Sequence, residues 1–290
     1  MSPSAALKQS LPRVPERLPA PPRESFYASI GARDEPTIFV NAMNDWPAMK
    51  KWSFDWFIKE HGETVVPVEW LKYSRSEDPG LSTRVGHVKS MKVREYVENM
   101  LKVNSPEAGY LIGKDLLGLL PSLLEDMRFP RYQSNNRLTE QLFFMGPRGT
   151  FTQLHYDRAH NMHAVFVGRK RWQLYSPERS AELRPTRLGF VWSVVSYYDL
   201  VPEGGNPEQL PNNAVPDYDF VLEAGEILYL PYGWWHRVLT VEPSIATNLW
   251  WWTLPMLARL GPKLIPSLVS STLKNIGKQD TRRGYYGRHS

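Results

Sequence analysis

The sequence predicts a mainly β protein with flanking helices, built around one large β-barrel. In its second half, short segments rich in β-branched and aromatic residues alternate with turn residues, as expected for barrel strands. Helical periodicity occurs in the first half and again near the C-terminus. The chain has 290 residues, 42% of them hydrophobic, which allows one such domain or two small ones.

Composition and charge exclude several classes of protein. The formal net charge of +5 is modest for this length, and much of the excess lies near the C-terminus, so we expect no nucleic-acid partner. The absence of Cys excludes disulfides and thiolate-bound zinc. We see no secretory signal and no apolar stretch long enough to span a bilayer, so we expect no membrane span and a cytoplasmic location.

The first half of the chain combines short strands with surface helices. Strands are expected at residues 35–40, 65–68 and 110–112, and a polar loop at 73–84. Ser53 is a favourable N-cap for a helix that ends near Gly62. Apolar residues at helical spacing predict a surface helix over 90–100. A leucine-rich helical pattern over 115–127 is interrupted by Gly118 and Pro121.

The second half contains the strands of the barrel. They are expected at residues 141–145, 151–156, 163–167, 171–175, 218–222, 227–231, 237–241 and 245–252. A tight turn at 224–226 separates two of them. We expect a basic insertion, helical or looped, at 179–187 and a loop rich in Gly, Asn and Pro at 202–216.

The two ends of the chain differ in composition from the middle. Residues 1–22 are rich in Pro, Ala, Ser and Arg, so we expect a flexible arm there. One large domain is expected over 23–255. Residues 256–290 are expected to form a helical segment, broken by prolines, and a basic tail.

Three residues far apart in the sequence form a candidate metal site. His155 and Asp157 lie two residues apart in an expected strand, so their side chains point to the same face. His236, beside two tryptophans, is the candidate third ligand. Two histidines and one carboxylate form the facial triad that binds non-heme Fe(II) and leaves positions open. Each motif alone is short, and a His-x-Asp is more often a surface or core pair than a ligand pair.

Two other histidines lie close to this motif. A rival metal set of His155, His160 and His163 is conceivable, but it requires a bend and leaves Asp157 and His236 unexplained. We therefore interpret His163 as a pocket wall or a core histidine.

Lys170 is the second informative residue. Gly168 and Arg169 form a plausible turn, so Lys170 begins the next strand with Trp172 at the alternate inward position. A lysine that points into a barrel is costly unless it meets an anion, and a dicarboxylate would supply one. The alternative is an edge-strand lysine that faces solvent. Thr152 has the opposite parity to His155, so it faces inward only if a bulge lies between them.

These motifs together resemble one family. The stretches 152–177, 225–231, 234–236 and 248–250 are similar to those of the JmjC-domain (cupin-like) Fe(II)/2-oxoglutarate oxygenases. The motifs are most similar to the asparaginyl-hydroxylase subgroup typified by factor inhibiting HIF. The resemblance covers roughly residues 25 to 255 and implies a double-stranded β-helix, the jelly-roll or cupin core of JmjC type.

The resemblance implies a role for eight residues. Three of them correspond to the iron ligands of the family: His155, Asp157 and His236. Five correspond to its cosubstrate pocket: Lys170, Thr152, Tyr110, Asn161 and Asn248. Within the second group, Lys170 pairs with the distal carboxylate of 2-oxoglutarate, assisted by Thr152 and Tyr110.

The resemblance also implies an activity. Its cofactors are Fe(II), 2-oxoglutarate as cosubstrate, and dioxygen, and the expected reaction hydroxylates a side chain in a protein or peptide. In that family the interval 190–198 is often a mobile loop over the site, and helices after the barrel often form a homodimer contact. Two alternatives stay open: a cupin-type metal enzyme that uses no 2-oxoglutarate, and a non-catalytic JmjC-like binding module.

Overall fold

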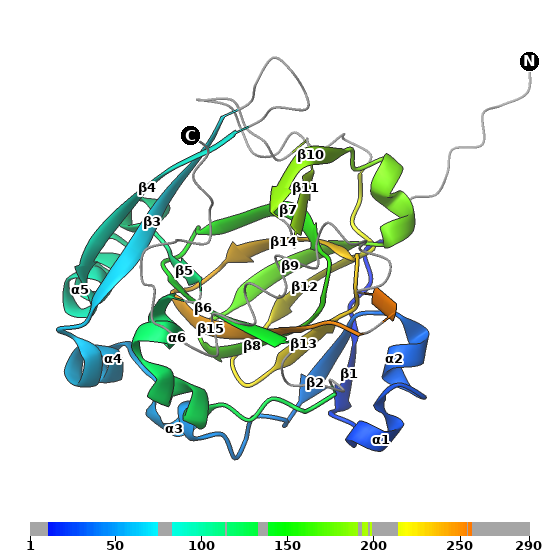
Figure 1. Cartoon of the computed structure of the whole chain (residues 1–290), viewed down its shortest axis with the longest axis horizontal. Helices are drawn as coiled ribbons and strands as arrows, with labels where there is room; N and C mark the ends of the chain where they lie inside the picture. The colour runs from blue at the N-terminus through cyan, green and yellow to red at the C-terminus, as the bar shows by residue number, and fades with distance from the viewer. Residues whose placement is uncertain are drawn as a thin grey trace, which may run out of the picture.

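The computed structural model describes residues 11–256 apart from 75–82, 114, 133–138, 191–192, 197, 199–213 and 254. Two β-sheets face each other and form the core of the domain (Figure 1). This arrangement confirms the predicted jelly-roll core with flanking helices.

The larger sheet has 7 strands, several of which come from distant parts of the chain. Its order is β1 (Glu16–Pro19), β2 (Thr37–Val40), β13 (Ile227–Leu230), β8 (His160–Val167), β15 (Ser244–Trp251), β6 (Thr139–Gly146) and β5 (Leu111–Gly113). The strands β8 and β6 flank β15 in antiparallel registers: β6 pairs with its whole length, and β8 pairs with residues 245–251 with one register shift. All eight residues of β15 are buried, as expected for a central strand covered on both faces.

The smaller sheet has 6 strands and carries most of the predicted site. Its order is β10 (Pro185–Phe190), β11 (Ser193–Ser196), β7 (Phe151–Asp157), β14 (Trp235–Thr240), β9 (Lys170–Tyr175) and β12 (Tyr218–Leu222). Because β7 and β14 are neighbours, residues about eighty positions apart in the sequence lie side by side.

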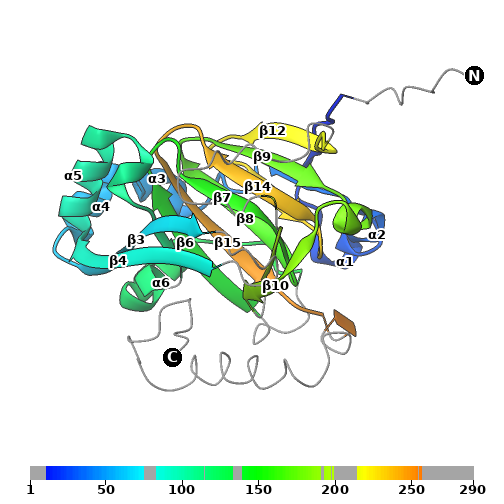
Figure 2. The same ribbon diagram turned by 90° about the horizontal axis from the view of Figure 1, so that it is seen from above.

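Helices and a β-ribbon cover the outside of the larger sheet. The helices are α1 (Arg23–Phe26), α2 (Ile30–Arg33), α3 (Pro47–Lys51), α4 (Phe54–His61), α5 (Val93–Val103) and α6 (Asp115–Leu119), with 3-10 turns at Pro106–Ala108, Pro121–Asp126 and Pro177–Ala181. The ribbon consists of β3 (Val65–Ser74) and β4 (Thr83–Lys92). Figures 1 and 2 show α3 to α6 and the ribbon on one side of the barrel, and α1 and α2 on the other.

Successive side chains of β6 point alternately to the helices outside the larger sheet and to the cavity between the two sheets. Phe143 faces outward into a large cluster with Trp52, which directly follows α3, and Phe57 of α4. Phe144, its neighbour, faces the cavity between the two sheets. The helix α4 begins as predicted, because the Ser53 hydroxyl accepts a hydrogen bond from the Trp56 amide at 3.1 Å.

Three expectations about irregular segments are corrected. The arm predicted over residues 1–22 contains β1, which pairs in parallel with β2, so this part is ordered by backbone hydrogen bonds that composition does not reveal. The loop predicted at 73–84 is entered by β3 and β4 from its two ends. The interval 190–198, for which the family resemblance implies a mobile loop over the site, contains β11, which pairs with β7.

Other expectations lie outside the described residues. They concern residues 1–10, most of the loop at 202–216, and the C-terminal segment with its homodimer contact, all of which stay predictions. No helix in the described part of the chain is long and apolar enough to cross a bilayer.

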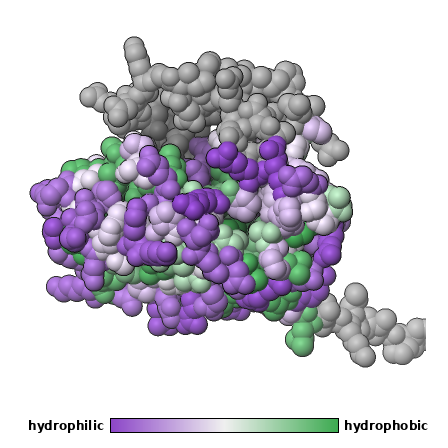
Figure 3. Space-filling view, turned by 90° about the horizontal axis from the view of Figure 1, so that it is seen from below, coloured by the Kyte–Doolittle hydropathy of each residue, from purple (hydrophilic) through white to green (hydrophobic). Residues whose placement is uncertain are grey.

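The described surface is mostly polar. The face seen in Figure 3 shows polar residues with apolar ones in small groups among them. Individual exposed apolar side chains such as Val88 and Leu101 are ordinary on a protein surface. The described surface thus gives no pointer to a site, whereas several polar side chains are buried between the sheets.

Candidate metal centre

The three predicted ligands converge between β7 and β14. His155 and His236 are directly opposite each other in the register of these strands, and their ring centroids lie 4.0 Å apart. Asp157 lies two residues further along β7 on the same face. Its Oδ1 atom lies 3.5 Å from His155 Nε2, and its Oδ2 atom lies 3.5 Å from His236 Nε2. One ligand atom from each residue falls within 4.8 Å of the others.

Backbone carbonyls orient both imidazoles for metal binding. His155 Nδ1 donates to the Gln153 carbonyl at 2.7 Å, and His236 Nδ1 donates to the Trp234 carbonyl at 3.0 Å. A carbonyl only accepts, so the proton is on Nδ1 and the Nε2 lone pair faces Asp157. Hydrogen bonds of this kind fix the tautomer and orientation of metal-binding histidines.

The carboxylate of Asp157 is buried, and no lysine or arginine of the described residues forms an ion pair with it. Burial raises its pKa, while His155 and hydrogen bonds from Ser193, Asn161 and Trp250 oppose that shift. The Ser193 hydroxyl donates to Oδ1 at 2.7 Å. Burial also lowers the pKa of His236 well below its usual value, so this imidazole is neutral. A divalent cation would compensate the buried carboxylate and use both free Nε2 lone pairs.

These observations fit a mononuclear metal site. Two imidazole nitrogens and one carboxylate on one side of a cavity form the facial set that suits non-heme Fe(II). All three residues line one cavity, so a metal held by them would be accessible to a small molecule there.

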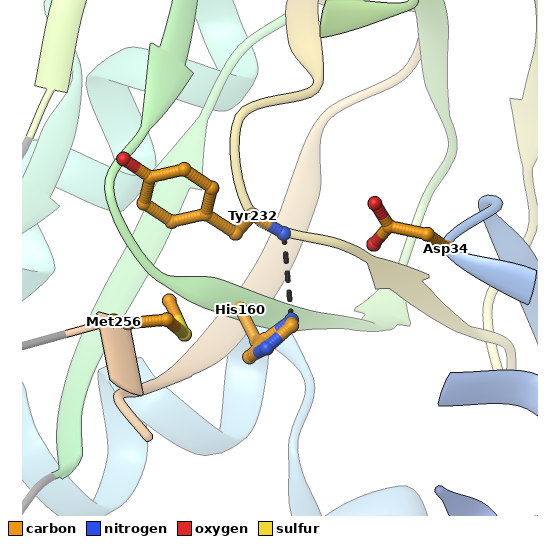
Figure 4. Close-up of a pocket in the computed structure, with 4 residues that line it drawn as sticks. All are labelled: Asp34, His160, Tyr232 and Met256. Carbon is orange, nitrogen blue, oxygen red and sulfur yellow. Dashed lines mark hydrogen bonds between the residues drawn. The ribbon is translucent and has the colours of Figure 1, made fainter. Parts of the chain in front are cut away.

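The rival set with His160 and His163 is not assembled. His160 Nδ1 accepts from the Tyr232 amide at 3.4 Å, and its ring stacks on Trp251 with centroids 5.1 Å apart. His160 lines a different pocket, with Asp34, Tyr232 and Met256 (Figure 4). It therefore points away from the site that holds His155.

The metal site opens into a cavity of about 100 Å³ between the two sheets. One water molecule needs only about 10–15 Å³ of such volume, so the cavity has room for a small organic molecule. Its lining includes all eight residues predicted from the sequence: His155, Asp157, His236, Lys170, Thr152, Tyr110, Asn161 and Asn248.

Lys170 forms a separate part of the cavity wall. It is 1% exposed, and its Nζ donates to the Tyr110 hydroxyl at 3.1 Å and the Thr240 hydroxyl at 3.2 Å. Among the described residues no acidic side chain forms an ion pair with it, and burial lowers its pKa to about 7. The edge-strand alternative is wrong, because β9 lies between β14 and β12.

A turn and a bulge place two of these residues. Gly168 has φ +73° and connects β8 to β9, where a Cβ would lie 2.1 Å from the Pro243 carbonyl oxygen. On β7, two residues between Thr152 and His155 face one residue between Val238 and His236 on β14. This is the bulge that the parity of Thr152 required, and it lets Thr152 and His155 line the same cavity.

The other predicted residues are held by neighbouring strands. Tyr110 pairs with Glu69 through two backbone hydrogen bonds of 2.8 and 3.0 Å, next to β5. Asn248 lies on β15, and its Oδ1 accepts from the Leu142 amide at 3.1 Å. Asn161 lies on β8 and hydrogen-bonds to Asp157. The structure thus places all three at the cavity.

Two residues at the site were not predicted. Thr240 is directly opposite Lys170 in the register of β14 and β9, and it also accepts from Thr150 at 2.8 Å. Ser193 lies in the interval that we expected to be a loop. Both depend on strand pairings between distant segments, and neither has a local sequence signal.

Comparison with known proteins adds a family to this geometry. The model of the cupin-like domain family matches residues 22–256. Jumonji C domain-containing protein 5 of Drosophila melanogaster is 27% identical over 81% of this chain and 59% of its own length. Lysine-specific demethylase 8 of Xenopus tropicalis is 29% identical over 81% of this chain and 52% of its own.

A third relative is named for its cofactors. The 2-oxoglutarate and iron-dependent oxygenase JMJD4 of Gallus gallus is 28% identical over 79% of this chain and 58% of its own length. The chain thus spans little more than half the length of these curated relatives. The predicted resemblance to JmjC-domain oxygenases is confirmed, whereas the special likeness to the asparaginyl hydroxylases stays a prediction. The chain belongs to the cupin-like domain family and is a domain of JmjC type.

Proposed function

We propose that this protein is an Fe(II)- and 2-oxoglutarate-dependent oxygenase that hydroxylates a side chain in a protein or peptide. One observation carries the proposal: a single cavity has a 2-His-1-carboxylate set in one part of its wall and, in another, a buried lysine that no described carboxylate pairs with. This pairing suits a cosubstrate that binds metal with one end and presents an anion at the other.

His155, Asp157 and His236 hold the metal on one face. Bound Fe(II), with 2-oxoglutarate and dioxygen, supplies the oxidising equivalents for C–H hydroxylation and leaves succinate and carbon dioxide. The two carbonyl-bound Nδ1–H groups keep both imidazoles in the ligating orientation, and Ser193 keeps the Asp157 carboxylate turned towards them.

Lys170 anchors the distal carboxylate of 2-oxoglutarate. Its Nζ is already held by Tyr110 and Thr240, so little side-chain freedom is lost when the anion binds. Thr152 lines the same cavity through the bulge in β7 and supplies a further hydroxyl. The anchoring groups thus fix the direction in which the cosubstrate reaches the metal.

The wall between the two ends excludes water. Trp172 is 2% exposed, and its ring stacks on that of His236 with centroids 5.6 Å apart. Val238 and Phe144 contribute apolar surface to the same cavity. Removal of water strengthens the attraction between Lys170 and a bound carboxylate.

Lysine or arginine demethylation of a protein is the second candidate. The relatives include proteins named lysine-specific demethylase 8 and arginine-specific demethylase JMJ22. Hydroxylation of an N-methyl group leads to its loss as formaldehyde, so one site can support either outcome. The product distinguishes them: a retained oxygen atom for hydroxylation, and formaldehyde for demethylation.

A turnover screen tests the proposal. The Fe(II)-loaded chain is incubated with 2-oxoglutarate and a peptide library that includes methylated lysine and arginine, and products are read by mass spectrometry and succinate release. We expect succinate formation that needs both iron and 2-oxoglutarate, and that is lost in Asp157→Ala. Turnover that is independent of 2-oxoglutarate would instead support a cupin-type metal enzyme, and metal binding without any succinate would support a binding module.

A further inference from the structure

Several buried polar atoms in the cavity wall have no hydrogen-bond partner among the described residues. The nitrogen atoms His163 Nε2 and Trp172 Nε1 are among them, in side chains that are 5% and 2% exposed, and so are the acceptor oxygens Gln153 Oε1 and Asn161 Oδ1. His163 and Trp172 line the same cavity as Lys170 and the candidate metal ligands. Buried polar groups without a hydrogen bond are rare and costly, so such atoms at a cavity indicate a bound molecule.

The two rings connect the lysine and metal parts of the cavity. The His163 ring packs between the rings of Phe144 and Trp172, with ring centroids 5.4 Å and 4.9 Å away, respectively. Phe144 in turn contacts Tyr110, the hydrogen-bond partner of Lys170. Trp172 stacks on the metal-ligand candidate His236. A molecule that extends from the metal to Lys170 therefore passes these two rings.

Both nitrogen atoms can act as hydrogen-bond donors to a carboxylate, which only accepts. The Trp172 indole is a donor and never an acceptor. Burial, followed by the charge of Lys170, lowers the pKa of His163 well below its usual value, so this imidazole is neutral. A neutral imidazole with its proton on Nε2 is also a donor, and a carboxylate accepts from both.

We propose that His163 and Trp172 are cosubstrate-binding residues that donate hydrogen bonds to the distal carboxylate of 2-oxoglutarate beside Lys170. This inference rests on the proposed function. It makes recognition of that carboxylate depend on one charge and two neutral N–H donors. The two donors make the site more selective than the charge of Lys170 alone, because a ligand without the distal carboxylate leaves both N–H groups unpaired.

Binding measurements test this assignment without any protein substrate. Isothermal titration of the full chain loaded with Mn(II) gives the dissociation constants of 2-oxoglutarate and of 2-oxopentanoate, which has the same chain length but no distal carboxylate. We expect His163→Leu to raise the dissociation constant of 2-oxoglutarate by about 10- to 100-fold, the usual range for a hydrogen bond to a charged group. The dissociation constant of 2-oxopentanoate is expected to change hardly at all. Trp172→Phe, which keeps an aromatic ring, is expected to act in the same direction.

Two further variants separate binding from structure. His163→Gln places an amide near the position of Nε2, so we expect it to restore most of the affinity for 2-oxoglutarate. Ser244→Ala is the matched control, because Ser244 Oγ is also buried without a partner in the described structure but does not line the cavity. This variant is expected to bind 2-oxoglutarate like the unchanged chain.

The possible outcomes differ for the two proposals. If the unchanged chain binds Mn(II) but not 2-oxoglutarate, the proposed function fails and this inference fails with it. If the unchanged chain binds 2-oxoglutarate and His163→Leu binds it equally well, only this inference is overturned. Equal weakening of 2-oxoglutarate and 2-oxopentanoate would also overturn it, since that pattern indicates a structural role.

Discussion

At the scale of single residues, the buried carboxylate of Asp157 is the most informative group. It is 3% exposed, and burial raises its pKa in the metal-free chain. A carboxylate in such a place opposes folding unless a cation or proton compensates it. Stability and metal binding are therefore linked at this residue.

Asp157→Asn is expected to separate these two effects. It removes the charge and an anionic ligand but keeps the shape and an oxygen that accepts from Ser193. We expect metal affinity to fall by more than the ~10–100-fold typical of losing an outer hydrogen-bond partner, while the metal-free variant melts no lower than the metal-free original. Metal titration and thermal melts with chelator measure both. Unchanged metal affinity would remove Asp157 from the ligand set.

Lys170 leads to a prediction about pH. Its pKa is lowered to about 7 by burial, so in the empty cavity it is half charged near that pH and mostly neutral above it. A bound carboxylate favours the charged form, so binding takes up a proton at higher pH. We expect the affinity for 2-oxoglutarate to fall as pH rises above about 7, by at most ~10-fold per pH unit.

The same titration with a neutral variant is the control. Lys170→Met keeps the length of the side chain without the charge, so its weaker binding of 2-oxoglutarate is expected to lose this pH dependence. Calorimetry in two buffers of different ionisation enthalpy also reports the proton taken up. An affinity that is flat between about pH 6 and 9 in the unchanged chain would contradict a titrating Lys170.

At the scale of elements, connections decide which side chains enter the cavity. The Gly168 turn begins β9 at Lys170, and the bulge in β7 brings Thr152 to the same face as His155. The alternation of side chains along strands predicted His155 and Asp157 correctly because both lie on one side of the bulge. It could state the need for a bulge between Thr152 and His155, but no residue type in that stretch locates one.

Gly168→Ala tests the turn. Its φ of +73° and the Pro243 carbonyl oxygen, 2.1 Å from where an added Cβ would lie, both disfavour a side chain. We expect a loss of more than about 1 kcal/mol in the free energy of unfolding, together with weaker 2-oxoglutarate binding through Lys170. Chemical denaturation and calorimetry measure the two effects.

Gly118→Ala is the matched control for that prediction. Gly118 lies in the helix α6, where an added Cβ would meet no described atom within 4 Å. Alanine is the better helix former by roughly 0.5–1 kcal/mol, so this variant is expected to gain stability and keep its 2-oxoglutarate affinity. Equal behaviour of the two variants would show that the Gly168 turn does not constrain the site.

At the scale of the whole molecule, sequence predicts what is local and misses what is paired at long range. The barrel strands and the helix after Ser53 follow from residue types and spacing, and they were confirmed within a few residues. Strand β1 was missed because its composition resembles a flexible arm, whereas its order comes from pairing with β2. Strand β11 was missed because the family resemblance favoured a loop there.

The candidate site shows the same division. Its metal ligands were predicted because strand alternation joins two of them and a motif supplies the third. The positions of His163, Thr240 and Ser193 depend on which distant strands become neighbours. Neighbouring residues alone could therefore not show that His163 faces Lys170 rather than an apolar core.

A crystal structure of the chain grown with iron and 2-oxoglutarate without oxygen, with an anomalous difference map at the iron edge, would show directly where the metal and the cosubstrate bind. We predict one strong peak within bonding distance of His155 Nε2, His236 Nε2 and the Asp157 carboxylate, with 2-oxoglutarate extending from it to Lys170. A peak elsewhere, or 2-oxoglutarate that does not reach Lys170, would show that these residues do not form the metal and cosubstrate site.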